Sequence, residues 1–174
     1  QGRLAGEGYM DAAGDILSRM STDSTVRLAC AADAGVVAQL LFDFDTEYDE
    51  PVPEVSVLAE RYAELLGNGE VTVLLVGDGP EGFAQLRFRP SVYSRSLDAY
   101  LEELYVVPSR RGHGLGRALL EAAIDEARGR GATHIDLGTS EDDVAARALY
   151  ESAGFTNREG KSDGPVMFYY ERDL

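Results

Sequence analysis

The chain has 174 residues, of which 44% are hydrophobic, and this length and composition favour one compact domain with a core of its own. Acidic side chains outnumber basic ones by 31 to 16, which argues against a nucleic-acid partner and favours a cationic ligand, unless the excess charge serves solubility alone. Since Cys30 is the single cysteine and no apolar stretch approaches the roughly 20 residues that cross a bilayer, we expect no disulfide, no metal, no membrane partner and a cytoplasmic location.

The first part of the chain carries four glycines before residue 24 and a short candidate helix near Asp11–Met20. We interpret residues 1–23 as an N-terminal extension or leader and residues 24–174 as the domain. Within the domain, Val26–Ala29 predicts a first strand. Asp33 is a candidate N-cap for the helix that follows, which has apolar residues at helical spacing.

The middle of the chain predicts a helix followed by an antiparallel sheet. The helix covers Glu54–Leu66, has its apolar residues on one face, and ends at the glycines that follow it. Two strands, Val71–Val76 and Glu81–Arg89, flank a glycine-rich turn and form a hairpin. Asp98–Val107 should extend that sheet.

The last third of the chain predicts an alternation of helices and strands. A helix begins at the glycines of residues 112–116 and continues at helical spacing through Ala118–Ala127. A strand covers Thr133–Leu137, a second helix covers Asp142–Ser152, and Gly164–Glu171 closes the sheet. The order is therefore mixed α/β (α+β), with an antiparallel front half and a strand–helix–strand unit behind it.

The most informative segment is Leu101–Arg117, which joins a buried strand to a helix through a basic turn with glycines at every second position. The free backbone N–H groups and the positive dipole at a helix N-terminus favour an anion such as phosphate. No acidic residue occurs between Val106 and Leu120, although the net charge of the chain is -15. The glycine spacing differs from the dinucleotide-binding and P-loop motifs. An ordinary turn with solvated arginines is the alternative.

This segment resembles motif A of the GNAT (Gcn5-related N-acetyltransferase) superfamily, Gln/Arg-x-x-Gly-x-Gly/Ala, at Arg111–Gly116. A second resemblance lies in Ala145–Phe155, which is similar to the family's Asn-x-x-Ala-x-x-Leu-Tyr-x-x-x-Gly-Phe segment, with Asp143 where the family usually has Asn. The resemblance implies a mixed sheet of about seven strands, mostly antiparallel with one splayed parallel pair, flanked by about four helices. It also implies acetyl-CoA as co-substrate and often a homodimer.

The family's coenzyme contacts can be carried over to matching positions of this chain. The pantetheine arm would pair with the main chain of one strand, and the diphosphate would lie on the N–H groups of the turn. The predicted coenzyme-binding residues are Leu104, Tyr105, Val106, Arg111, Gly112, His113, Gly114, Leu115, Gly116, Arg117, Asp143 and Ala146.

Two residues are candidates for proton transfer during acetylation of an amine, which needs a base for the ammonium and an acid for the leaving thiolate. The strand sequence Tyr100-Leu101-Glu102-Glu103 resembles that of diamine and polyamine acetyltransferases, and by this match Glu102 is the base. Strand side chains alternate, so Glu103 is the second candidate and both face one side only if a bulge intervenes. The family position of Tyr150 implies proton donation to the thiolate. A solvated Glu102 and a merely structural Tyr150 are the alternatives.

The acceptor is predicted from an acidic and aromatic segment that we interpret as a loop over the active site. The candidate acceptor residues are Phe42, Asp43, Phe44, Asp45, Glu47 and Tyr48. Aromatic rings among carboxylates favour a small cationic amine, although such charge runs are often only solvated surface. Three alternatives stay open: a protein N-terminus or lysine as acceptor, a coenzyme-A-binding sensor without catalysis, and an acidic interaction domain.

Overall fold

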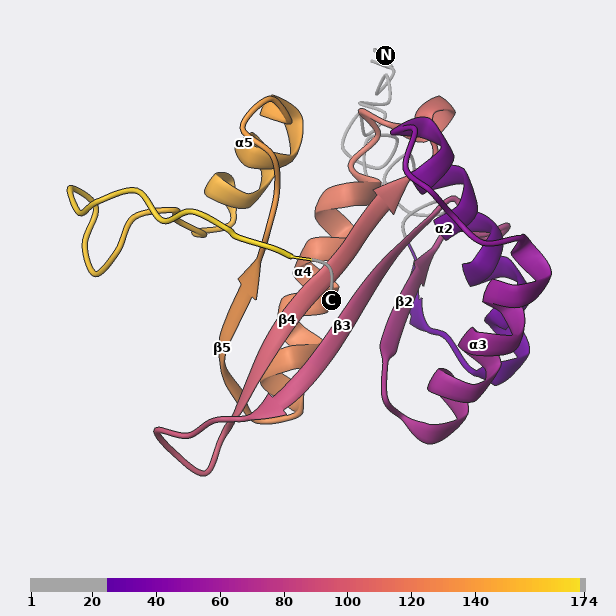
Figure 1. Ribbon diagram of the computed structural model, residues 1–174, viewed down its shortest axis with the longest axis horizontal. Coiled ribbons are helices and arrows are strands. Elements are labelled where there is room, and N and C mark those ends of the chain that lie inside the picture. The colour runs from indigo at the N-terminus through magenta and orange to yellow at the C-terminus, as the bar shows by residue number, and fades with distance from the viewer. Residues whose placement is uncertain (1–24, 173–174) are drawn as a thin grey trace, which may run out of the picture.

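The computed structural model describes residues 25–172, which form a five-stranded sheet with helices on both faces (Figure 1). The strands are β1 (Val26–Leu28), β2 (Thr72–Val76), β3 (Gly82–Pro90), β4 (Leu97–Val106) and β5 (Ala132–Leu137). Their order in space follows their order in the chain, and all neighbours are antiparallel except β4 and β5. The candidate helix near Asp11–Met20 lies outside the described residues.

The helices divide between the two faces of the sheet. One face carries α2 (Ala34–Glu47) and α3 (Val55–Asn68), and the other carries α4 (Leu115–Gly129), as Figure 1 shows. The 3-10 turns η1 (Ala31–Asp33) and η2 (Pro108–Arg110) precede α2 and α4, and α5 (Val144–Ser152) follows β5. None of the helices in residues 25–172 has both the length and the apolar character to span a membrane.

The two faces have separate hydrophobic cores, because strand side chains alternate between them. In β2, Val73 and Leu75 pack with α2 and α3, whereas Leu74 and Val76 pack with α4. All five residues of β2 are buried, which explains why this strand is an uninterrupted run of apolar residues apart from Thr72. The predicted mixed α/β class is confirmed.

The strand count differs from the expectation of about seven, because the sheet of the described residues has five strands. The segment Gly164–Glu171, predicted to close the sheet, forms only one isolated bridge, between Arg158 and Val166. Pro165 lacks an N–H group for a ladder, and the side chains that follow, from Met167 to Tyr170, are 50–87% exposed. In Figure 1 the chain runs outward after α5, and Gly164–Glu171 is the leg that returns toward the sheet.

The predicted cap at Asp33 is also different in detail. Asp33 occupies the N-cap position of α2, but its carboxylate makes no bond to that helix. It accepts a hydrogen bond from the Cys30 amide at 2.8 Å and pairs with Arg27 at 2.7 Å. The carboxylate therefore stabilises the preceding 3-10 turn η1.

Two irregularities in β4 shape the site. The pairing of β3 with β4 shifts between Gln85, opposite Glu103, and Leu86, opposite Leu101, so Glu102 is an extra residue in a β-bulge. The pairing of β4 with β5 covers only residues up to Leu101. From residue 102 onward, the edge of β4 that faces β5 is therefore open.

Candidate active site

The open edge of β4 presents main-chain groups from alternate residues. The Val107 amide donates to the Glu81 carbonyl at 2.9 Å, so by strand alternation the main-chain groups of Tyr105 also point toward β3. Those of Leu104 and Val106 then point to the open edge. Of the three residues predicted to pair with the pantetheine arm, two have the required direction, and Tyr105 contributes a buried ring instead.

The glycine turn has the backbone that the motif suggests. Gly112 and Gly114 have φ angles of 77° and 85°, a left-handed conformation that favours glycine. No atom lies within 4 Å of where a Cβ would stand at either position, so the space above the turn is open. Gly114 is the N-cap of α4, and the first intrahelical bond is donated by Ala118, which leaves the amides of Leu115, Gly116 and Arg117 for an anion.

The side chains of the turn are engaged with the protein itself. The Arg111 guanidinium forms two hydrogen bonds to the Glu47 carboxylate, each of 2.7 Å, and its Nε donates to the Val106 carbonyl at 2.9 Å. His113 Nδ1 lies 2.9 Å from the Arg111 carbonyl oxygen. Arg110 pairs with Glu81 at 3.0 Å. An anion at this turn would therefore be bound mainly by main-chain N–H groups, because the side chains of Arg110 and Arg111 are paired with carboxylates of the protein.

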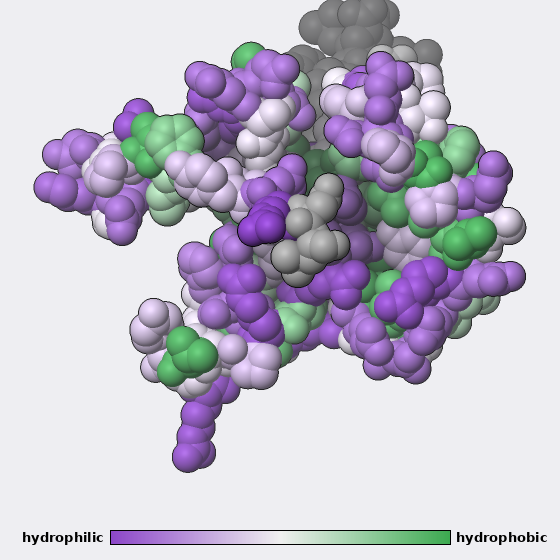
Figure 2. Space-filling view, in the orientation of Figure 1, coloured by the Kyte–Doolittle hydropathy of each residue, from purple (hydrophilic) through white to green (hydrophobic). Residues whose placement is uncertain are grey.

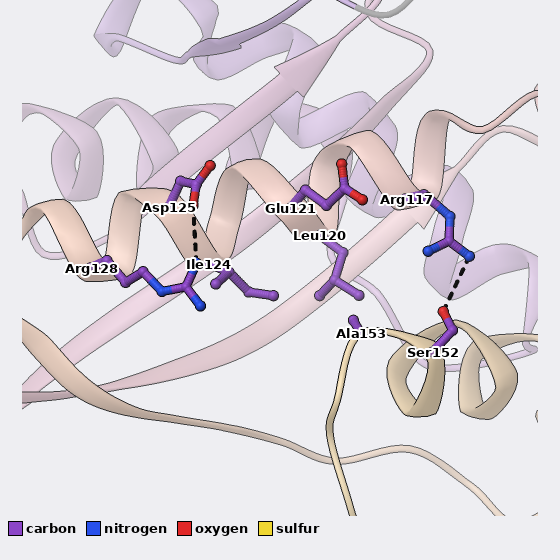
Figure 3. Close-up of a pocket in the computed structure, with 8 residues that line it drawn as sticks. All are labelled: Arg117, Leu120, Glu121, Ile124, Asp125, Arg128, Ser152 and Ala153. Atoms are coloured by element: carbon purple, nitrogen blue, oxygen red, sulfur yellow. Dashed lines mark hydrogen bonds and ion pairs between the residues drawn. The ribbon is translucent and has the colours of Figure 1, made fainter.

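The remaining arginine of the motif, Arg117, points toward α5 and donates to Ser152 Oγ at 3.1 Å (Figure 3). It borders a groove of about 330 Å³ between α4 and α5. Figure 3 shows the pair Asp125–Arg128 farther along α4, so charges of both signs line this groove. Among its lining residues only Arg117 was predicted to bind the coenzyme, and the groove contains none of the candidate catalytic residues.

The bulge directs both glutamates of β4 toward α2 and α3, whereas Leu101 and Leu104 pack on the α4 side. Glu102 accepts hydrogen bonds from Gln85 Nε2 at 2.6 Å and from Arg87 Nε at 2.7 Å. Glu103 has no hydrogen bond or ion pair among those that the structure shows in residues 25–172. Burial, followed by the negative charges of Asp45 and Glu102, raises its pKa to about 7.

Tyr150 comes from α5 and is 9% exposed, packed against the ring of Phe155 at a centroid distance of 6.0 Å. Burial, followed by the charges of Asp143 and Glu103, raises its pKa to about 12, so the phenol keeps its proton at neutral pH. Asp143 is the N-cap of α5 and accepts a hydrogen bond from the Ala146 amide at 2.9 Å. Both predicted coenzyme contacts on α5 are therefore already bonded to each other.

The six predicted acceptor residues do not lie in a loop, because α2 continues to Glu47 and Tyr48 is its C-cap. One local bond supports the helix here, because Gln39 donates to Asp43 Oδ1 at 2.8 Å, four residues later. Phe44 contributes to the core through its ring contact with Tyr105, at 5.2 Å between centroids. A cavity of about 390 Å³ beside this helix end is lined by Phe42, Asp43, Thr46, Glu47, Tyr105, Val107 and Pro108.

Among these acids, Asp45 is the one whose negative charge acts on Glu103. Burial, followed by the charge of Glu50, raises the pKa of Asp45. Its carboxylate also contributes to the raised pKa of Glu103. Figure 2 shows that the side of the molecule seen in Figure 1 is mostly hydrophilic, with hydrophobic residues in separate small patches.

Sequence reasoning missed Tyr62, Gln85 and Arg87, which surround Glu102. Tyr62 Oη donates to Gln85 Oε1 at 2.7 Å, and Gln85 is 6% exposed. A glutamine in the middle of the apolar strand sequence Gly82–Phe88 was the signal, because a buried amide needs partners for both its donor and its acceptor.

A sheet that opens between two parallel strands, beside a glycine turn that begins a helix, agrees with the fold that the motif resemblance implies. Residues 37–155 match the Acetyltransferase (GNAT) family, and the chain belongs to this family. It is an N-acetyltransferase, like the relatives to which it is similar.

Three of these relatives illustrate the similarity. An aminoglycoside N(6')-acetyltransferase type 1 from Stenotrophomonas maltophilia is 32% identical over 78% of this chain and 88% of its own. The [ribosomal protein bS18]-alanine N-acetyltransferase of Escherichia coli K12 is 47% identical over 40% of this chain and 54% of its own. A protein from Arthrobacter sp. FB24, whose crystal structure is known, is 44% identical in sequence. Its structure matches this one with a TM-score of 0.81, over 88% of this chain and 98% of its own.

Proposed function

We propose that this protein is an acetyl-CoA-dependent N-acetyltransferase that modifies a primary amine of a small cationic acceptor by direct attack in a ternary complex. One observation carries the proposal: the open edge of β4 leads from Glu103 to the glycine turn at the start of α4. A coenzyme along this edge would pair with Leu104 and Val106 and place its diphosphate on the free amides of the turn.

The residues present fit that coenzyme. Gly112 and Gly114 leave open space above the turn, and the left-handed backbone turns successive N–H groups toward it. Arg111 already occupies the Val106 carbonyl, which leaves the Val106 amide and both main-chain groups of Leu104 for pairing. When bound, acetyl-CoA would supply the activated acetyl group as a thioester.

Glu103 is our candidate for the base, in place of Glu102. Glu102 is held by Gln85 and by the cation of Arg87, whereas Glu103 has a pKa near 7 and can take a proton from an ammonium near neutral pH. Glu103 takes this proton directly or through water, and the neutral amine then forms the N–C bond as the C–S bond breaks. The second amine proton replaces the one that Tyr150 gives to the sulfur. Tyr150, still protonated, donates its proton to the leaving sulfur.

The acceptor class follows from the charges around Glu103. Asp45 and Glu102 add negative charge to this part of the α2–α3 face, and the exposed ring of Tyr48 lies on the edge of Phe44 at 5.3 Å. Carboxylates and aromatic faces together attract ammonium groups, with about 0.5–2 kcal/mol from each cation–π contact. The aminoglycoside-modifying relative supports an acceptor with several amines.

A protein N-terminus is the second candidate acceptor. It is favoured by the similarity to the ribosomal-protein alanine N-acetyltransferase, which covers about half of that protein's length. The two candidates differ in charge, because a peptide N-terminus carries one ammonium where an aminoglycoside or polyamine carries several.

Both candidate acceptors can be tested by measuring thiol release from acetyl-CoA. The panel of amines contains polyamines, aminoglycosides and a peptide with an N-terminal alanine. We expect turnover with polycationic amines, a drop of at least about 100-fold in kcat for Glu103→Gln, and no change for the exposed Glu141→Gln as control. Coenzyme binding without turnover on any amine would contradict the proposal. Turnover on the peptide alone would favour the second acceptor.

The same proposal includes a cytoplasmic enzyme that forms homodimers, as members of the family often do. Light scattering at micromolar concentration would detect the dimer, and a monomer at all concentrations would contradict it.

A further inference from the structure

A line of hydrogen-bonded polar side chains runs over one face of the sheet from α3 to the bulge of β4. Tyr62 Oη donates to Gln85 Oε1 at 2.7 Å, and Gln85 Nε2 donates to Glu102 Oε2 at 2.6 Å. Arg87 Nε donates to the same Glu102 oxygen at 2.7 Å. Tyr62 and Gln85 are 4% and 6% exposed, so breaking this chain of hydrogen bonds would leave buried polar groups without partners.

This row of hydrogen bonds ends at Glu102, the extra residue of the bulge. Glu102 has no partner in the register of β3, which passes from Gln85 opposite Glu103 to Leu86 opposite Leu101. Two donors from β3 hold its carboxylate instead, and its side chain is 28% exposed. A bulge residue without a register partner gains a defined conformation through such side-chain bonds.

The bulge decides where the next residue points. In a regular strand Glu103 would share the face of Leu101 and lie against the apolar core of α4. The extra residue turns Glu103 to the opposite face, which it shares with Tyr105. A carboxylate in the acceptor site therefore depends on the geometry that Gln85 and Arg87 give to Glu102.

We infer that Glu102 is a positioning residue: held by Gln85 and Arg87, it maintains the bulge that turns Glu103 into the acceptor site and sets the charge that Glu103 meets there. The inference rests on the proposed role of Glu103 as base. It gives the hydrogen bonds that join Tyr62, Gln85, Glu102 and Arg87 a role in setting the position and the charge surroundings of that base.

The groups that face Glu103 come from every element around it. Asp45 on α2 and Glu102 on β4 are negative, and Arg87 on β3 is positive and paired with Glu102. Tyr62 on α3 and Tyr150 on α5 are neutral phenols, whose pKa values are raised mainly by burial and in part by the charge of Glu103. Burial is the largest cause of the raised Glu103 pKa, and the charges of Asp45 and Glu102 add to it.

Opposite charge changes at the Glu102–Arg87 pair should therefore shift the pH dependence in opposite directions. Glu102→Gln removes a negative charge, so the pKa of Glu103 falls and the acidic limb of the pH–kcat/KM profile moves to lower pH. Arg87→Gln leaves the Glu102 charge unneutralised, so that limb moves to higher pH. Each shift should be about 0.5–1 pH unit, as expected for one charge at a partly exposed site.

The double variant should return the limb close to its original position, and Arg87→Lys should keep it there. A pair with a structural role alone would lower turnover in both variants and leave the limb in place. Shifts in the same direction, or none, would overturn the inference.

Two controls make each result decisive. Arg87 is 42% exposed, so its replacement spares the core, and its upward shift tests the inference even if Glu102→Gln does not fold. The Glu103 carboxyl can also be titrated by carbon NMR without turnover. If Glu103→Gln keeps the acidic limb, the proposed base is wrong; if Glu103→Gln removes the limb and the Glu102 and Arg87 variants leave it in place, only the present inference fails.

Discussion

Substitution of two neighbouring glycines of the turn by alanine should have opposite effects on stability. Gly114 has a φ of 85°, where an L-residue costs about 1–2 kcal/mol, and since its surroundings are open the cost comes from the backbone alone. Gly116 is helical, and a Cβ there would meet Leu149 Cδ2 at 3.6 Å and Val106 Cγ2 at 3.9 Å, both ordinary contacts. Alanine at this position should stabilise the helix by about 0.5–1 kcal/mol.

The difference between the two variants is large enough to measure. We expect Gly114→Ala to lower the free energy of unfolding by about 1–2 kcal/mol, a decrease in Tm of about 2–8 °C for a domain of this size, and Gly116→Ala to raise it. Urea unfolding followed by circular dichroism would give both values, with an unchanged m-value as the check that only stability has changed.

The same variants test the coenzyme site. Calorimetric titration with coenzyme A should show weaker binding for Gly114→Ala, because relaxation of the left-handed residue redirects the amides at the start of α4. Equal stability losses in both variants, or a neutral Gly114→Ala, would refute the assignment of a left-handed turn at this position.

Three further substitutions test other parts of the structure. Glu47→Gln frees the Arg111 guanidinium and removes a negative charge beside the turn. Calorimetry should therefore show tighter coenzyme A binding at low salt and a smaller gain in affinity at high salt, and weaker binding would contradict this. Phe83→Ala empties a fully buried position between the sheet and α2, and urea unfolding should show a loss of about 3–5 kcal/mol, whereas a loss below about 2 would speak against that packing. Asp143→Ala removes the bond that caps α5 at the Ala146 amide and should cost about 1 kcal/mol in the same assay, while no loss would mean that the cap is not needed.

Several elements were predictable because their signals are local. The strand and the helix that flank the glycine turn follow from hydrophobic periodicity, and the helix over residues 55–68 ends at a left-handed Gly69, as its glycines suggested. The turn itself was identified from residue type, since a positive φ at Gly112 and Gly114 is a property of single residues. The roles proposed for its amides stay predictions.

The acceptor side was less predictable. The segment that begins at Phe42 was interpreted as the connection between the first two helices, yet up to Glu47 it forms the last turns of α2. What decides this is the burial of Phe44 against Tyr105, a contact with a residue 61 positions later in the chain (105 − 44). The strand predicted at Gly164–Glu171 does not form for a related reason. A strand needs a neighbour to pair with, and β-propensity within one segment does not show whether that neighbour exists.

The sequence alone therefore determined the order of elements from Val26 to Ser152, the glycine turn and the family, because these depend on residue types and short spacings. Tertiary structure alone decided that Glu102 and Glu103 share a face, since a one-residue shift in strand register reverses the direction of a side chain. It also decided that Arg111 binds Glu47, two residues 64 positions apart. Contacts of this kind depend on how separate elements pack, and no local pattern in either segment encodes them.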